Sequence, residues 1–402
     1  MSAIVFEVSV PRFLAAKSAG RVSDWFLTGP LSGLSLRELP RRALPGPRWV
    51  RLEPIASGVC GSDLALVRFE SSPALEPFSS FPAVLGHEVV ARVVEVGREV
   101  TAVREGDRVA LDPTLSCEAR GFDPPCASCA AGAPGTCARA GDAGPAVGRG
   151  TFVGFHADLP GGWGPDVVAH ESQLHVVPAS LSDDAAVLTE PLSVAMHAVL
   201  QTPLERGPAL VIGSGPIALG TVWALRAAGF DGAIVAQTKR AHEAALAKRL
   251  GATETVTLGG ATHALLATGA KAYRPILGPE VYAGGGFPLV FDCVGGEDSL
   301  AQAMRFVAPR GRVVLLGCAG ERRLDLSFLW AREVTLQGFL CYGREKDGAH
   351  TFDVTLRRLV EGSAPVAEMI THRFPRSRYR EALAACTNRA KSGAIKVLFT
   401  PG

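Results

Sequence analysis

ALVIGSGPIALG, residues 209–220, is the most informative stretch of the 402-residue sequence. A short apolar run, typical of a buried strand, leads into a glycine turn, and a helical pattern follows. Gly213 permits the tight turn, Gly215 lets a pyrophosphate approach the backbone, and the small Ala218 lets helix pack on strand. We expect a dinucleotide phosphate to bind here, where exposed N–H groups and the positive helix end attract an anion. The candidate binding residues are Gly213, Gly215, Pro216, Ile217 and Ala218.

Strand and helix patterns alternate on both sides of this turn. GAIVAQ (232–237), LVFDCVGG (289–296) and GRVVLLG (311–317) read as strands, and AHEAALAKRLGA (241–252) reads as a helix. Such alternation predicts a doubly wound parallel sheet with helices on both faces. SDDAAVLTEPLSVAMHAVL (182–200) reads as a helix with Ser182 as its N-cap. Residues 259–288 are a glycine-rich interruption without a clear pattern.

The sequence before residue 180 has a different texture. Short apolar runs ended by turn residues, such as VRLEPIASGV (50–59), HEVVARVVEVG (87–97) and GDRVALDP (106–113), predict a β-rich region. Residues 1 to about 45 show no sustained period and are expected to be irregular. Residues 116–165 are rich in Gly, Pro, Cys and Ala. A loop of this composition cannot bury a core of its own, so we expect it to need an additional stabilising interaction. The tail predicts helices over 349–362 and near 379–386, and a last strand, AIKVLF (394–399).

The end of the second strand, VAQTKR (235–240), bears on the choice between NAD and NADP. Dinucleotide-binding folds that bind NAD usually have Asp or Glu at this strand end, where the carboxylate accepts hydrogen bonds from the ribose hydroxyls. Here Gln237 or Thr238 occupies the position, depending on the count, and Lys239 and Arg240 follow. The two cations could pair with a 2′-phosphate, so the sequence favours NADP over NAD. The alternative is that they are the solvated start of a helix.

Two groups of residues suggest metal sites. Cys60, the His87-Glu88 pair and Glu190 offer a thiolate, an imidazole and carboxylates, which suits zinc with an open position for substrate oxygen. Four cysteines in the glycine-rich loop suit a closed structural zinc: Cys117, Cys126, Cys129 and Cys137. Asp123 competes with Cys117 for the fourth position. The alternative for the first group is that its members are unrelated core and surface residues. The alternative for the second is that some of its cysteines are free thiols in a loop without metal.

Composition narrows the class of protein. Lys and Arg number 41 and Asp and Glu 39, so the net charge of +2 gives no reason to expect nucleic acid or an anionic membrane. The nine cysteines are an odd number, and MSAIVFEVSV is a poor signal peptide, so we expect a reduced, cytoplasmic protein. Residues 207–225 are uncharged and nearly long enough to span a membrane, but IGSGP breaks any single helix there.

Taken together and in order, these motifs resemble the zinc-containing medium-chain dehydrogenase/reductase family, especially its polyol and threonine dehydrogenase branch. The resemblance runs from about Val50 onward and rests on GVCGSD, GHE, GDRV, the cysteine loop, EPLSVAMH, GSGPIALG, FDCVGG and ITHRFP. It implies a GroES-like β-rich catalytic domain, whose chain leaves and returns, and an inserted Rossmann domain. The boundaries would be 1–180 (with 1–45 an N-terminal extension), 181–340 for the Rossmann domain, and 341–402 for the return.

The resemblance also assigns roles. Cys60 and His87 would ligate the catalytic zinc, with Glu88 a ligand or close neighbour and Glu190 bound directly or through water. Ser62 would hydrogen-bond the substrate oxygen and relay its proton, and Asp63 would orient His87. Three departures stand out: Ala65 replaces a relay histidine, Asp123 stands where the first loop cysteine is expected, and residues 259–288 are longer than usual.

We therefore expect a zinc-dependent oxidoreductase that transfers hydride between a small alcohol or polyol, or its carbonyl, and NADP(H) or NAD(H). The alternatives are a zinc-independent quinone or enoyl reductase of the same superfamily and a non-catalytic nucleotide-binding protein. By the resemblance the chain would be a homodimer or homotetramer. Phe122, Phe155 and Trp163 would line the substrate cleft or serve as packing. Cys293, Cys318, Cys341 and Cys386 are expected to be ordinary packing residues.

Overall fold

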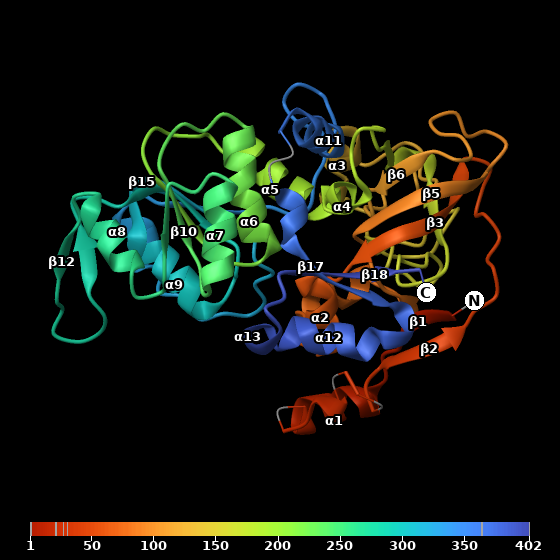
Figure 1. The fold of residues 1–402 in the computed structure, drawn as a ribbon, viewed down its shortest axis with the longest axis horizontal. Coiled ribbons are helices and arrows are strands. Elements are labelled where there is room, and N and C mark those ends of the chain that lie inside the picture. The colour runs from red at the N-terminus through yellow and green to blue at the C-terminus, as the bar shows by residue number, and fades with distance from the viewer. Residues whose placement is uncertain (1, 21, 27, 30, 363–364, 402) are drawn as a thin grey trace. The chain divides into compact units, whose positions relative to one another are not determined.

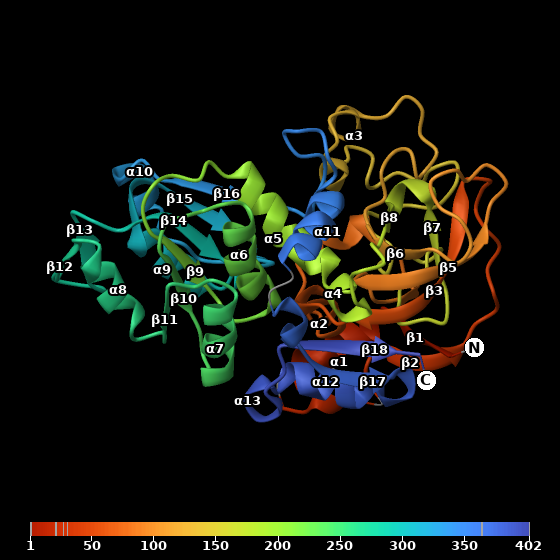
Figure 2. The same ribbon diagram turned by 45° about the horizontal axis from the view of Figure 1, so that its top comes forward.

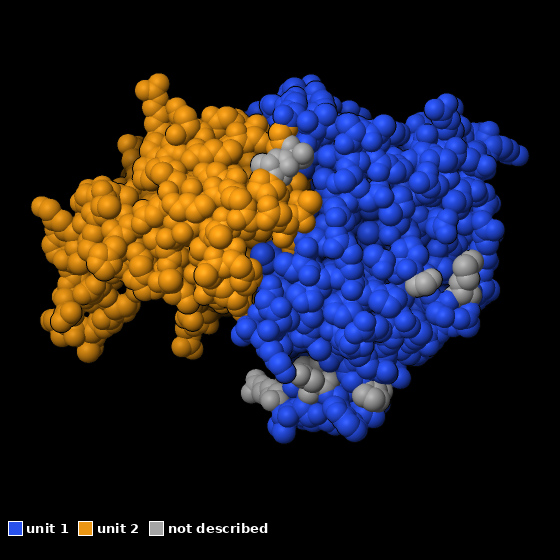
Figure 3. All heavy atoms as spheres, viewed as in Figure 1, with its two compact units in different colours: residues 1–190, 342–361, 370–402 blue, residues 191–341, 362–369 orange. Residues whose placement is uncertain are grey.

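The structure is a computed structural model that describes residues 2–20, 22–26, 28–29, 31–362 and 365–401. Its ribbon is shown in two views (Figures 1 and 2). The chain divides into two compact units, coloured separately in Figure 3. Unit 1 comprises residues 1–190, 342–361 and 370–402, and unit 2 comprises residues 191–341 and 362–369. The chain therefore leaves unit 1 after residue 190, returns at residue 342, and enters unit 2 once more at residues 362–369.

Unit 2 is built on a six-stranded parallel sheet with the order β11-β10-β9-β14-β15-β16. Numbered along the chain, this is the 3-2-1-4-5-6 order of a dinucleotide-binding fold. Figure 2 shows α6 and α7 on one side of this sheet and α9 and α10 on the other. The doubly wound sheet predicted from the sequence is thus confirmed. The strands are β9 (Ala209–Ile212), β10 (Ile234–Gln237), β11 (Glu254–Val256), β14 (Phe287–Asp292), β15 (Val307–Leu315) and β16 (Thr335–Gly338).

The helices of unit 2 follow their strands as the apolar pattern predicts, and those around the first two strands cover the predicted spans. They are α6 (Pro216–Ala227), α7 (Ala241–Arg249), α8 (Ala261–Ala267), α9 (Glu297–Phe306) and α10 (Ser327–Ala331). Nearly all of α5 (Thr189–Gln201) also lies in unit 2, before the first strand, and the short η5 (Val366–Met369) follows α11 (Thr351–Gly362). The glycine-rich interruption contains α8 and a two-stranded hairpin, β12 (Lys271–Tyr273) and β13 (Val281–Ala283).

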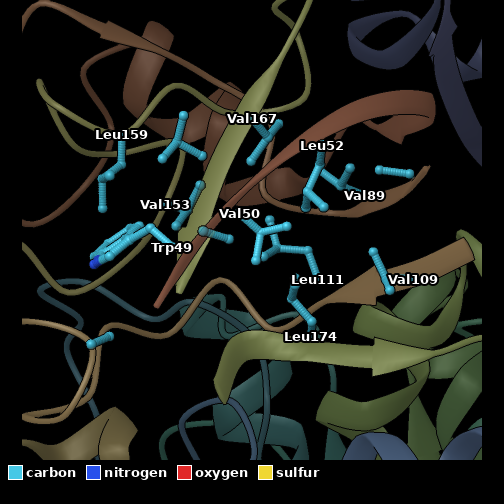
Figure 4. Close-up of a cluster of buried hydrophobic side chains, with 14 of the residues drawn as sticks. Trp49, Val50, Leu52, Val89, Val109, Leu111, Val153, Leu159, Val167 and Leu174 are labelled. Carbon is cyan, nitrogen blue, oxygen red and sulfur yellow. The ribbon is translucent and has the colours of Figure 1, made fainter. Parts of the chain in front are cut away.

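Unit 1 is organised around a seven-stranded sheet with the order β17-β18-β3-β5-β6-β8, in which β7 also pairs with β3. Its pairs are antiparallel apart from β17 and β18, which run parallel. Apolar side chains from these strands form the core drawn in Figure 4, including Trp49, Val50 and Leu111. The strands are β3 (Trp49–Gly58), β5 (Val89–Val96), β6 (Arg108–Leu111), β7 (Val167–His170), β8 (Leu174–Val176), β17 (Ile370–Pro375) and β18 (Lys396–Thr400).

Short helices surround this sheet. In the returning chain, α12 packs against β17 and β18, and α11 carries the helix expected in the tail. The helices are α2 (Gly61–Val67), η2 (Pro73–Phe78), α3 (Ala127–Ala130), η3 (Pro134–Thr136), η4 (Glu171–Gln173), α4 (Asp183–Ala186), α11 (Thr351–Gly362), η6 (Arg376–Arg378), α12 (Tyr379–Thr387) and α13 (Arg389–Ser392).

The expectation that residues 1–45 are irregular was wrong. This stretch holds β1 (Ser2–Phe6), α1 (Val10–Ala19), η1 (Asp24–Phe26) and β2 (Leu34–Glu38), and β1 pairs with both β2 and β4 (Ala83–Val84). Ile4 and Phe6 are fully buried. Because these pairings join residues far apart in sequence, no local hydrophobic period predicts the strands.

The helix expected over 182–200 is interrupted. Ser182 does cap α4, its Oγ accepting from the Ala185 N–H at 3.2 Å. A second helix, α5 (Thr189–Gln201), begins after two residues. Pro191, which lacks an amide hydrogen, lies in the first turn of α5, where no N–H is needed, but it cannot continue α4.

The uncharged stretch 207–225 divides into β9, a turn and α6, as its glycines predict. Among the residues that the structure describes, no helix has the length and apolar character required to cross a bilayer.

Candidate catalytic metal site and cofactor turn

The candidate catalytic residues of unit 1 converge from separate elements. Cys60 precedes α2, and His87 and Glu88 precede β5; one donor atom from each lies within 4.8 Å of the others. His87 and Glu88 are buried and Cys60 is half-buried. The structure therefore brings the thiol of Cys60 together with an imidazole and a carboxylate that follow it by 27 and 28 residues in the sequence, a donor set that suits zinc.

Asp63 lies behind this group and is fully buried. Its Oδ2 accepts from the Cys60 N–H at 2.9 Å, and its Oδ1 lies 3.4 Å from His87 Nδ1. A carboxylate facing Nδ1 fixes the ring so that Nε2 remains available as a ligand atom. Burial alone would lower the pKa of His87, but the charges of Asp63 and Cys60 raise it well above its usual range.

Glu88 has a partner that the sequence did not suggest. Lys396, at the start of β18, places Nζ 2.6 Å from both Glu88 carboxylate oxygens, and its side chain is only 2% exposed. Although burial opposes the charge, the carboxylate of Glu88 and the nearby Cys60 raise the pKa of Lys396. Gly58 makes room for the pair, because a Cβ there would lie 1.8 Å from Glu88 Oε2. The one signal in the sequence was a lysine inside the apolar strand AIKVLF.

Glu190 is not one of the three donors that lie within 4.8 Å of one another, although the charges of His87 and Glu88 act on it. It is buried in the first turn of α5, and its Oε1 accepts from the Tyr342 hydroxyl at 3.1 Å. Burial, aided by the charge of Glu88 and opposed by His87 and Lys396, raises its pKa to about 7. Tyr342 lies 152 residues away along the chain and has no motif around it that could have been recognised.

Ser62 is half-buried in the first turn of α2, and Ala65 lies one turn further on. Of the three aromatic candidates, Phe155 lies beside the site, with its ring centroid 5.1 Å from that of His87. Trp163 is fully buried, and its indole N–H donates to the Gly58 carbonyl at 3.1 Å, so it is a packing residue. Phe122 lies between the guanidinium groups of Arg120 and Arg139, 5.2 and 5.0 Å from its ring centroid.

The four loop cysteines form a second group with all sulfur atoms within 4.8 Å of one another: Cys117, Cys126, Cys129 and Cys137. The Cys137 sulfur lies 3.6 Å from that of Cys117 and 3.7 Å from that of Cys126. Zn–S bonds of about 2.3 Å in a tetrahedron place sulfur atoms roughly 3.8 Å apart. These thiols therefore already have the spacing of a zinc site. Asp123 is exposed and does not belong to the group.

Backbone N–H groups of the same loop point at these sulfur atoms. The Cys126 N–H donates to Cys117 Sγ at 3.4 Å, and the Cys117 N–H donates to Cys129 Sγ at 3.3 Å. The Cys129 N–H donates to Cys126 Sγ, which lowers the pKa of that thiol to about 6. The fully buried Arg120 donates to Cys137 Sγ at 2.9 Å. Such donors stabilise thiolates, the form that binds metal, but burial outweighs them at Cys129 and Cys137 and raises the pKa of both thiols.

The remaining cysteines differ from the expectation at one position. No disulfide joins any of the nine cysteines. Burial raises the pKa of both Cys293 and Cys386 to about 12, as expected for thiols in packing positions. Cys318 is exposed, so the interpretation that it packs in a core was wrong.

In unit 2, the glycine turn lies between β9 and α6. Gly213 has a φ of +126°, which favours glycine, and a Cβ there would lie 3.3 Å from Ala218 Cβ. Gly215 is the N-cap of α6 and Pro216 its first residue, followed by the half-buried Ile217. Gly215 provides no side-chain cap, so the N–H groups of the first turn face outward for an anion. This geometry suits a pyrophosphate.

The end of β10 holds the residues expected to contact the adenosine ribose. Gln237 and Thr238 are buried, and Gln237 Oε1 has no hydrogen-bond partner. Lys239 is exposed, whereas Arg240 Nη1 donates to Glu243 Oε1 at 2.7 Å. Thus the two cations are not equivalent, because Arg240 already has a carboxylate partner.

Two family models match the chain: the alcohol dehydrogenase GroES-like domain over residues 46–179 and the zinc-binding dehydrogenase over residues 216–360. The chain is 30% identical over 370 residues to a probable diacetyl reductase, (R)-acetoin forming, of Saccharomyces cerevisiae, with 86% of this chain and 82% of the relative covered. It is also 30% identical over 387 residues to sorbitol dehydrogenase of Arabidopsis thaliana, with coverage of 94% and 96%.

Among solved structures, a zinc-binding dehydrogenase from Sinorhizobium meliloti 1021 bound to NADP has a TM-score of 0.71 at 24% identity and full coverage of both chains. The chain therefore belongs to the zinc-containing medium-chain alcohol dehydrogenase family, with a GroES-like domain and a Rossmann domain. It is accordingly an NAD(P)-linked oxidoreductase of the alcohol dehydrogenase class.

Proposed function

We propose that the protein oxidises a small alcohol or polyol, or reduces the matching carbonyl, at the Cys60, His87 and Glu88 group, with NADP(H) preferred to NAD(H). The convergence of these three donors within 4.8 Å is the observation that carries the proposal. A zinc-independent quinone or enoyl reductase, or a nucleotide-binding protein without activity, would have no use for such a group. The related diacetyl reductase and sorbitol dehydrogenase support a substrate with neighbouring oxygen functions.

In this proposal Cys60 and His87 hold the catalytic zinc, and Glu88 and Glu190 flank it. Zinc bound there would act as a Lewis acid on the substrate oxygen and favour loss of the hydroxyl proton. Asp63 holds the His87 ring in the orientation that ligation requires, through the 3.4 Å contact at Nδ1. Ser62, one residue before Asp63, would accept the hydroxyl proton. With Ala65 in place of the family's histidine, that proton must reach water by a different route.

Unit 2 binds the cofactor in this proposal. A nicotinamide cofactor bound there would supply the acceptor for the hydride of the substrate carbon. Gly213, Gly215 and the first turn of α6 hold the pyrophosphate, and Gln237 gives its unpartnered Oε1 to the ribose. Lys239 is exposed and lies two residues after Gln237, and it would pair with a 2′-phosphate. No carboxylate stands at Gln237 or Thr238 to repel that phosphate.

The cysteine loop would hold a second, structural zinc through Cys117, Cys126, Cys129 and Cys137. It has no open position, because four thiolates complete a tetrahedron.

We further propose that residues 1–180 and 341–402 form the catalytic domain and residues 181–340 the cofactor domain. The protein would act in the cytoplasm as a homodimer or homotetramer, and size-exclusion chromatography with light scattering measures that assembly.

Metal analysis combined with an alcohol and polyol panel, run with NADP and with NAD, tests the proposal. The wild type should contain zinc and reduce NADP in the presence of at least one substrate, followed by the absorbance of the reduced nicotinamide. Cys60→Ala should lose this activity and one zinc per chain, while Cys386→Ala, a cysteine outside both groups, should lose neither. An active Cys60→Ala protein with its zinc undiminished would contradict the proposal.

A further inference from the structure

A third group of metal-binding side chains lies in unit 1, outside both proposed zinc sites. Asp112 follows β6, His175 lies on β8, and His350 immediately precedes α11. One donor atom from each lies within 4.8 Å of the other two. The strands β6 and β8 pair directly, with Ala110 opposite His175. The returning chain thus adds a histidine to a pair of residues already held together by the sheet.

His175 is oriented as metal-bound histidines are. Its Nδ1 lies 2.8 Å from Asp353 Oδ1 in the first turn of α11. Because a carboxylate only accepts, the neutral tautomer that pairs with it has its hydrogen on Nδ1 and its lone pair on Nε2. His175 is only 8% exposed, and Nε2 is buried without a hydrogen-bond partner. An unsatisfied buried nitrogen is costly, and it is rare in folded proteins. A ligand at Nε2 would remove that cost.

Asp112 and His350 complete the group. Asp112 is 4% exposed; its Oδ1 accepts from the Thr114 N–H at 2.7 Å, and its Oδ2 lies 3.2 Å from His350 Nε2. Ligand atoms about 2.0–2.1 Å from a tetrahedral zinc are roughly 3.3 Å apart, so this pair already has the required spacing. The rings of His175 and His350 stack with centroids 4.5 Å apart. Ligation would replace the His350 Nε2–Asp112 Oδ2 contact with bonds to the ion, and it would break the Phe352 N–H to His350 Nδ1 bond of 3.2 Å.

We propose that Asp112 Oδ2, His175 Nε2 and His350 Nε2 bind one divalent transition-metal ion, with zinc the best match. Two imidazoles and a carboxylate are ligands that zinc prefers, and a water molecule would take the fourth position. The His350 side chain is 21% exposed, which gives the ion a path from solvent. The metal would fasten the start of α11 to β6 and β8. Its role is structural, and it does not depend on the proposed alcohol oxidation.

Zinc content per chain, measured by mass spectrometry on the purified full-length protein, tests this site. Wild type should contain one zinc more than His175→Gln, while His372→Gln, a histidine elsewhere in unit 1, should match wild type. Both variants should retain dehydrogenase activity, because neither residue belongs to the catalytic group. Equal zinc content in wild type and His175→Gln after growth and dialysis with added zinc would overturn the proposal.

Asp353→Asn provides a second test that does not depend on replacing a buried ligand. The Asp353 side chain is 55% exposed, so the variant should fold. Loss of the carboxylate behind His175 should weaken Co²⁺ binding at this site about 10- to 100-fold in a spectroscopic titration, and Asp353→Glu should restore part of it. Identical Co²⁺ titrations for wild type, His175→Gln and Asp353→Asn would show that the group is only a hydrogen-bonded cluster.

Discussion

Lys396 and Glu88 form an ion pair from which water is almost excluded, with side-chain exposures of 2% and 1%. Both oxygens of the carboxylate are occupied by one ammonium group at 2.6 Å. A pair of this kind contributes modestly when intact, because desolvation offsets the attraction, but it is costly to break. The arrangement fixes the position of Glu88 beside Cys60 and His87 and holds β18 against the site.

Lys396→Met should therefore destabilise the protein by about 3–5 kcal/mol, because it leaves the Glu88 carboxylate buried without its cation. Urea unfolding of the zinc-loaded protein measures this change. Lys391→Met, at an exposed position, should change the unfolding free energy by less than about 0.5 kcal/mol.

The double variant Lys396→Met with Glu88→Leu distinguishes two causes of destabilisation. One is the loss of the attraction between the ammonium and carboxylate groups, and the other is the cost of leaving the carboxylate buried without a cation. It should be more stable than Lys396→Met alone, since an apolar pair removes the uncompensated charge. A double variant at least as unstable as the single one would show that the pair itself, and not the isolated carboxylate, controls stability.

At the scale of elements, the cysteine loop is held by its sulfur atoms. It has only one-turn helices, α3 and η3, and no strand between residues 117 and 137. The apolar residues around it, including Leu115, Ala119, Val147 and Val153, lie in the core of unit 1, so its two ends are anchored. The middle of the loop contains the four thiols and depends on what they bind.

Cys117→Ser and Asp123→Asn distinguish the two candidates for the fourth position. Cys117 is fully buried and 3.6 Å from the Cys137 sulfur, whereas Asp123 is exposed. Cys117→Ser should lose the loop's zinc and become sensitive to proteolysis between residues 117 and 137. Asp123→Asn should keep both the metal and the resistance. Zinc loss in Asp123→Asn with retention in Cys117→Ser would reverse the assignment.

Glu171, in η4, anchors a different loop and provides a pH-dependent test. It is 3% exposed and accepts from Arg48 Nε at 2.7 Å and from the Thr101 and Ala102 N–H groups at 2.7 and 2.9 Å. Burial alone would raise the pKa of Glu171, but these donors outweigh it and lower the pKa to about 2. Folding thus favours the ionised form.

Glu171→Gln should destabilise the protein by roughly 2 kcal/mol at pH 7, where the wild-type group is ionised in both states. Because the folded pKa is depressed, this advantage is complete above the unfolded pKa of about 4.3 and disappears as the pH falls from there toward 2. Urea unfolding of both proteins between pH 7 and pH 3 measures it. The exposed Glu53→Gln is the control, and a constant difference across that range would contradict the assignment.

The elements that could be predicted from the sequence are those whose signal is local. β9, the glycine turn and α6 lie within one continuous stretch, and Cys60 and His87 lie in short motifs. Lys396 and Tyr342 could not be found in this way, because their partners are 308 and 152 residues away. The N-terminal strands could not be predicted for the same reason, since β1 depends on pairing with β2 and β4.

At the scale of the whole molecule, the two units divide the chemistry. Among the residues that the structure describes, the three groups of candidate metal ligands all lie in unit 1, and the glycine turn and the end of β10 lie in unit 2. The proposed preference for NADP therefore rests on residues of unit 2. It can be changed without touching any proposed metal ligand.

Lys239→Glu should lower kcat/KM for NADP by at least roughly tenfold and affect NAD much less, because the new carboxylate repels the 2′-phosphate. Steady-state kinetics with both cofactors measures the ratio. Arg240→Gln should have a smaller effect, since Arg240 is paired with Glu243. Equal losses with NADP and NAD in Lys239→Glu would remove the basis for the NADP preference.

The return of the chain to unit 1 also bears on how the protein is synthesised. Glu88 leaves the ribosome 308 residues before Lys396, and at about 5–20 residues per second this interval lasts roughly 15–60 s. Early in that interval the nascent chain comes to contain the four loop cysteines as well as Cys60 and His87, but the sheet lacks β18 until the end. A message that terminates shortly before codon 396 would therefore encode every proposed ligand of both zinc sites and leave the Glu88 carboxylate without its cation.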